Sequence, residues 1–164
     1  MNLERFTEKA QQAVVMSQQN AIRMDHQQVD GEHMALALVE QEDGLIPRIL
    51  LSLGVNPDEL AQKLRDELER QPKVYGAAAS NVYATRRFNQ VLLKAEEIAK
   101  KHRDEYVSVE HIFMALMQEK GGLTKELMQQ YGIDAKLFEG ALEKVKGGRR
   151  VTSQNPEMGY QALE

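Results

Sequence analysis

Two histidines could carry chemistry in this chain, and they occupy equivalent positions in a sequence that repeats itself. His33 follows Glu32, His111 follows Glu110, and each pair precedes a densely apolar run. Imidazole is a common ligand of zinc, but no further ligand pattern surrounds either histidine. The pattern therefore favours histidines that hydrogen-bond near a helix N-terminus over histidines that bind a metal.

The two glutamates allow two interpretations. Glu32 and Glu110 fall in the first turn of a predicted helix, where the helix dipole favours negative charge. A carboxylate in that place could also bind a cationic group on a partner, and the sequence leaves this second role open. His26 and His102 lie near the ends of long predicted helices, where we expect surface residues.

The rest of the sequence contains no pattern that organises a reacting group. We find no phosphate-binding loop, no dinucleotide fingerprint, no H-E-x-x-H pair and no nucleophile elbow, and cysteine is absent from the 164 residues. We therefore expect this chain to be no enzyme by itself and to hold no catalytic residue, no cofactor and no metal.

Charge and hydropathy narrow the range of partners. The net charge is −4 with both signs interspersed, which argues against a nucleic-acid surface because such surfaces neutralise phosphate with clustered Lys and Arg. No apolar run approaches the roughly 18 residues that span a bilayer, so we expect no membrane partner. The lack of cysteine allows a reducing compartment, and we expect a cytoplasmic location.

A stretch of ten residues occurs twice, at 29–38 and 107–116, and the match continues without a gap beyond it. The copies lie 78 positions apart, from His33 to His111. A fixed self-similarity of this length indicates one supersecondary unit written twice. Each copy opens with a helix start, because Asp30 and Ser108 are good N-cap residues.

Helical periodicity predicts four helices in each half. The expected spans in the first half are 6–24, 30–41, 46–53 and 57–71. In the second half we expect a long helix over 88–102, a core helix that starts at Ser108, a short helix over 123–130 and a last helix that Asp134 caps and that includes Val145. We expect Gly44 to end the second helix and Gly54 the third. The first helices align from Phe6 to Phe88, an offset of 82, which predicts a longer turn after the first helix of the first half.

The predicted fold is all-α, an eight-helix pseudo-twofold bundle, because neither half alone hides its apolar stripes as well as the pair does. We expect one domain over residues 1–146, with repeat 1 at about 3–71, a linker at 72–83 and repeat 2 at about 84–146. Residues 147–164 are expected to form a flexible linker toward a further module. The absence of a long heptad seam predicts that the isolated domain is monomeric.

These residues resemble a known family. Two copies of a Val-x-x-Glu-His helix, each followed by a Gly-Leu turn and a short helix closed by glycine, are similar to the Clp N-terminal repeat domain of the Hsp100 family. The resemblance covers about residues 3–146. The tail at 147–157 and 160–164 is similar to the segment that joins this domain to the first ATPase module in the disaggregase branch of the family.

The resemblance implies a mobile substrate-recognition domain on an ATP-driven hexameric disaggregase. Such a protein works with the DnaK system on unfolded or aggregated clients in the bacterial cytoplasm, and its ATP is bound by modules absent from this chain. The alternatives are an adaptor-docking domain of a protease-coupled unfoldase, as in ClpA and ClpC, and a structural cap on the ring.

The family binds exposed hydrophobic stretches in an apolar groove where the two repeats meet. The matching positions here are Thr7, Val91, Leu92, Asp104, Glu110 and His111. Lys94 and His111 stand where relatives often carry leucine. The resemblance therefore implies a more polar and weaker groove in this chain.

Overall fold

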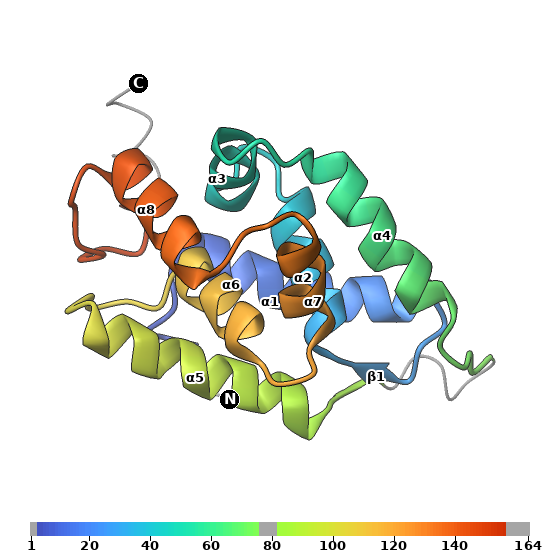
Figure 1. The fold of residues 1–164 in the computed structure, drawn as a ribbon. Coiled ribbons are helices and arrows are strands. Elements are labelled where there is room, and N and C mark those ends of the chain that lie inside the picture. Colours follow the sequence, from blue (N-terminus) through green and yellow to red (C-terminus); the bar gives the residue numbers. More distant parts are fainter. Residues whose placement is uncertain (1–2, 76–81, 157–164) are drawn as a thin grey trace.

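The computed structural model of the chain describes residues 3–75 and 82–156. Within these residues the chain forms eight α-helices and two strands of two residues each (Figure 1). In chain order they are α1 (Glu8–Arg23), β1 (Gln28–Val29), α2 (Gly31–Glu40), α3 (Leu45–Ser52), α4 (Pro57–Glu69), β2 (Tyr83–Ala84), α5 (Arg86–Lys101), α6 (Val109–Gln118), α7 (Leu123–Gln130) and α8 (Ala135–Lys146). The predicted all-α, two-repeat fold is confirmed, with one small parallel strand pair added.

The two repeats superpose at one offset along their whole length, including the first helices. Thr7 and Thr85 are the N-caps of α1 and α5, and both side chains accept the backbone N–H three residues on. Asp25 and Arg103 follow the two helices with matching left-handed φ angles of 60° and 59°. The predicted offset of 82 is therefore wrong, because Phe6 precedes α1 whereas Phe88 lies inside α5.

Short parallel pairings lock the repeats together reciprocally. Ala84, just before α5, pairs with Val29, just before α2. At the equivalent place, Phe6 before α1 pairs with Val107 before α6. Each repeat therefore donates its leading segment to the other, and neither half has a complete set of backbone partners alone.

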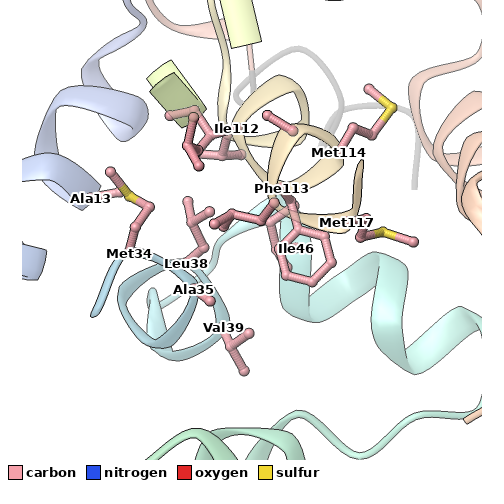
Figure 2. Packing of buried hydrophobic residues seen from close by; sticks show 14 of the residues in the cluster. Ala13, Met34, Ala35, Leu38, Val39, Ile46, Ile112, Phe113, Met114 and Met117 are labelled. Carbon is pink, nitrogen blue, oxygen red and sulfur yellow. The ribbon is translucent and has the colours of Figure 1, made fainter. Parts of the chain in front are cut away.

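The core lies around the two central helices. Every residue from Gly31 to Val39 and from Val109 to Met117 is buried, as expected of helices that are apolar on all sides. Figure 2 shows side chains of α2 and α6, with Ile46 of α3, converging in one cluster. Within the second repeat, Phe113 stacks on Phe138 of α8 with ring centroids 5.3 Å apart. A single cluster of buried side chains contains residues of both repeats, which therefore share one core.

Glycine has two different roles at the helix ends. Gly54 and Gly132 adopt φ angles of +80° and +75° after α3 and α7, the left-handed conformation that only glycine reaches without strain. Gly44 does not end α2 as predicted. It is the N-cap of α3 with φ −82°, since α2 already ends at Glu40.

The tail is a correction to the predicted flexible linker. Gly147 and Gly148 end α8 with positive φ as expected, but residues 149–156 then turn back and dock on the domain (Figure 1). Val151 is fully buried, and its backbone meets the loop after α5. The docked tail is held by backbone hydrogen bonds, and the small number of apolar residues in the tail does not predict them. Residues 157–164 lie outside the described residues, as do 76–81 of the internal linker.

Candidate functional site

The structure buries the side chains of all six predicted site residues. None has more than 8% of its surface exposed: Thr7, Val91, Leu92, Asp104, Glu110 and His111. Val91 and Leu92 lie on the inner face of α5. Asp104, Glu110 and His111 form a polar cluster beside α8. These residues are therefore not an open groove in the structure, and a binding surface must be sought around them.

The polar cluster is built on the capping histidine of α6. His111 Nδ1 accepts the N–H of Ser108 at 2.8 Å, and its Nε2 lies 2.7 Å from Asp104 Oδ2. An acceptor Nδ1 leaves the proton on Nε2, so the ring is neutral and donates to the carboxylate. The predicted hydrogen bond near a helix N-terminus is confirmed for this histidine and, through Asp30 and His33, in the first repeat.

A buried lysine completes the cluster. Lys146, the last residue of α8, places Nζ 3.2 Å from Glu110 Oε2 and 3.9 Å from Asp104 Oδ2. The two carboxylates and one ammonium leave one uncompensated negative charge beside a neutral imidazole. Neither oxygen of Glu110 accepts a hydrogen bond within the described residues. Glu110 is therefore held by charge alone.

Asp104 is the best-satisfied carboxylate of the cluster. Burial raises the pKa of its carboxyl, but the hydrogen bonds from His111 and from the N–H of Val151, together with Lys146, outweigh burial and lower the pKa overall. The N–H of Val151 reaches Asp104 Oδ1 at 2.7 Å. The docked tail is thus a direct partner of the cluster.

The first repeat has a neutral version of the same arrangement. His26 stands where Asp104 does, and its Nδ1 lies 2.8 Å from His33 Nε2. Leu68 stands in the place of Lys146. Burial lowers the pKa of His33 to about 4 and also lowers that of His26. The expectation that His26 lies on the surface is wrong, because the pairing with His33 draws it into the core.

Sequence reasoning missed Arg87, which joins the repeats by ion pairs with Asp30 and Glu32 of the first repeat. Its guanidinium reaches Asp30 at 3.1 Å, Glu32 at 3.2 Å and Glu119 at 2.9 Å. Hydrogen bonds to Glu119 raise the pKa of Arg87 above its usual range. The repeat gave no signal, because the equivalent residue is Lys9, which contacts the carbonyl of Glu42. Glu32 is therefore an internal ion-pair partner as well as a first-turn acid.

The outer surface of α5 carries the apolar exposure that the six residues lack. Leu93 is 60% exposed and lines a shallow hollow with Phe6, Asn89, Leu92 and Glu96. We call this hollow the α5 shelf. A second hollow beside it is lined by Gln90, Val91, Lys94, Ala115, Gln118 and Glu119. Val91 and Leu92 thus form the floors of two surface hollows.

Leu93 could have been found in the sequence. It interrupts the polar side of α5, since the apolar stripe of that helix runs through Leu92, Ala95 and Ala99. An exposed leucine alone is common in a protein, and the hollow beside Leu93 exists only because buried Phe6 of the other repeat lines it.

Two further findings concern the described residues only. They contain no group of three or more histidine, cysteine, aspartate or glutamate side chains placed to hold a metal ion. In the same part of the chain, no helix combines the length and the apolar character needed to cross a membrane.

Comparison with known proteins places this geometry in a family. The model of the Clp repeat (R) N-terminal domain matches residues 5–156. The chaperone protein ClpB of Nitratidesulfovibrio vulgaris is 44% identical over 167 residues, and that of Clostridium tetani 42% over 165. The alignments cover 100% and 99% of this chain but 19% of each relative. The chain thus spans about a fifth of the length of these relatives.

Solved structures share the fold at low sequence identity. The Hsp104 N-terminal domain from Candida albicans has a TM-score of 0.80 at 18% identity and covers 94% of this chain and 99% of its own. The N-terminal domain of ClpD from Arabidopsis thaliana has a TM-score of 0.64 at 20% identity, with 87% and 98% covered.

Proposed function

This chain belongs to the family of Clp repeat N-terminal domains, and on that premise we propose that it recognises clients for a ClpB-like Hsp100 chaperone. The clients are unfolded or aggregated proteins that expose apolar segments. ATP binding, the hexamer and cooperation with the DnaK system belong to the rest of such a protein, in the cytoplasm. The chain's own part is to bind a client and to hold no nucleotide.

The observation that supports this proposal is the α5 shelf. It offers Leu93 to solvent above buried Leu92 and beside Phe6. A site for many unrelated chains needs apolar area with few fixed polar demands. Burying a leucine side chain contributes about 1.5–3 kcal/mol, which suits weak and reversible capture. The polar rim of Asn89 and Glu96 limits contact with the domain's own copies.

The test measures binding of one client protein in its native and in its unfolded state. We would measure fluorescence anisotropy of a labelled lactalbumin, native and after reduction and alkylation, against increasing concentrations of the domain. We expect micromolar or weaker binding of the unfolded form and none of the native form. Equal binding of both forms, or of neither, would contradict client recognition. Binding of a folded adaptor protein alone would instead favour the adaptor-docking class.

A further inference from the structure

We propose that residues 149–156, which we call the strap, are a built-in competitor for the client: they occupy a peptide-binding cleft next to the α5 shelf, and their release opens it. The inference rests on the proposed function and deepens it. It assigns a second subsite, a ligand chemistry and a means of regulation to the same face of the domain.

The strap is held as a bound peptide would be, through its backbone. The carbonyl of Val151 accepts the N–H groups of Glu105 at 2.7 Å and Tyr106 at 3.2 Å. The N–H of Val151 donates to Asp104 Oδ1 at 2.7 Å. All three hydrogen bonds involve the backbone of Val151 and none involves its side chain. The side chain at this position needs only to be apolar, because Val151 is fully buried.

A second anchor lies three residues along the strap. The carbonyl of Gln154 accepts the N–H of Glu8, the first residue of α1, at 2.9 Å, and Gln154 Nε2 donates to the carbonyl of Glu4 at 3.2 Å. An N–H at a helix N-terminus has no partner inside the helix. A client segment that presents a carbonyl there can take the place of Gln154, which itself lies in a bend.

The cleft therefore recognises a defined chemistry. It takes a segment like the strap, which buries Val151, bends at Ser153 and Gln154, presents the carbonyl of Gln154 and buries Pro156. This is the class of ligand already proposed for the shelf, an exposed apolar stretch of an unfolded chain. The two subsites adjoin, since Phe6 on the shelf lies between Glu4 and Glu8, so one client segment can span both.

The carboxylates of the buried cluster favour a cleft that is covered by a peptide segment. Glu110 has no hydrogen-bond partner among the described residues, and Asp104 loses a donor when the strap leaves. An uncovered cleft therefore holds two carboxylates beside the single ammonium of Lys146. We infer that a client residue must supply the N–H that Val151 supplies now, which makes strap and client mutually exclusive.

The test undocks the strap in the full chain. Val151→Asp places a carboxylate against Asp104 in a buried position and releases the segment, whereas Thr152→Asp changes an exposed neighbour and is the matched control. Undocking is read independently of binding, by hydrogen exchange of the Glu105 and Tyr106 N–H groups. We expect fast exchange in V151D and wild-type protection in T152D.

Client affinity then decides the proposal. If the strap is docked in most molecules, the apparent affinity for the client is reduced in proportion to the fraction of molecules with an open cleft. Release of the strap should therefore tighten binding of unfolded lactalbumin by about tenfold. A synthetic peptide of residues 149–156 should compete with the client on V151D. T152D should bind as the wild type does.

The outcomes separate the two proposals. If V151D exchanges fast and binds the client no more tightly, the strap is no competitor, while the proposed function stands. If neither wild type nor V151D binds the client, the proposed function falls and this inference with it. Should V151D fail to fold, Val151→Gly keeps the N–H and removes only the buried side chain. Unchanged affinity in V151G with fast exchange overturns the proposal equally.

Discussion

At the scale of single residues, the two repeats use the same positions with opposite electrostatics. Position for position, Leu68 and His26 of the first repeat become Lys146 and Asp104 in the second. Removing one member of a buried ion pair costs far more than the pair contributes, because the remaining charge is left without a partner. The second repeat is therefore the one whose core depends on charge balance.

Lys146→Met tests that dependence. The substitution leaves Asp104 and Glu110 without a cation, and we expect the free energy of unfolding to fall by about 3 kcal/mol. Urea unfolding measures the loss. Lys144→Met, on the exposed side of α8, is the control and should change stability by about 0.5 kcal/mol or less. Adding Glu110→Gln to Lys146→Met should restore part of the loss.

The histidine pair of the first repeat predicts acid sensitivity. The folded-state pKa of His33 is about 4, against 6.5 as its usual value, because burial disfavours the charged ring. The unfolded chain therefore takes up the proton first. Stability is complete above pH 6.5 and falls as the pH drops toward 4, by up to about 3 kcal/mol.

The measurement is the difference between two pH profiles. Urea unfolding of the wild type and of His26→Gln/His33→Gln at several pH values isolates the contribution of the pair from that of the carboxylates. We expect the variant to lose less stability than the wild type between pH 6.5 and 4. Parallel profiles would show that the pair does not titrate in that window.

At the scale of elements, the reciprocal strand pairs and Arg87 join the repeats. Arg87 is 44% exposed on its side chain, so solvent screens part of its attraction, but Glu32 is nearly buried behind it. We expect Arg87→Met to lower the free energy of unfolding by about 1–2 kcal/mol. The neighbouring Arg86→Met, on an exposed face, should be neutral in the same urea titration. Equal effects of the two substitutions would argue against a stabilising role for the ion pairs of Arg87.

The docking of the tail was not predicted from the sequence. Ending the chain after Gly148 removes the buried Val151 side chain and the carbonyls that accept three N–H groups. We expect a loss of about 1.5 kcal/mol and a thermal midpoint about 4 °C lower. A midpoint unchanged within error, measured by circular dichroism, would mean that the tail stays undocked in solution.

The sequence predicted the helices well because each has a local signal. Asp30 and Ser108 cap α2 and α6 as predicted, and Pro57 opens α4. The contacts that were missed are long-range. Val151 meets Asp104 across 47 positions, and no periodicity records such a contact. The alignment of Phe6 with Phe88 failed because two aromatic residues looked equivalent although their structural roles differ.

The candidate site was harder to predict than the fold. The resemblance pointed to α5, where Val91 and Leu92 line two hollows, but the residues that it named are buried. Leu92→Ser, an obvious test from the sequence, would damage the core because the side chain is 3% exposed. Exposure depends on how α1 and α5 pack across the two repeats, which one helical stripe does not reveal.

At the scale of the whole molecule, large apolar side chains are exposed on several helices, and Leu93 is the one that lines the α5 shelf. Leu93 provides exposed apolar area there without supporting the core, so it can be changed while the domain stays folded. Leu137 of α8 is 52% exposed and lies outside both hollows, which makes it a matched control for any general effect of removing a surface leucine.

The most direct test of client recognition compares Leu93→Ser with Leu137→Ser for binding of unfolded lactalbumin, after thermal melts confirm that both variants fold. Partial burial of one leucine against a client contributes about 1–2 kcal/mol. We therefore expect Leu93→Ser to weaken binding by about fivefold or more and Leu137→Ser to leave it unchanged. Wild-type affinity in Leu93→Ser, or an equal loss in both variants, would contradict recognition at the α5 shelf.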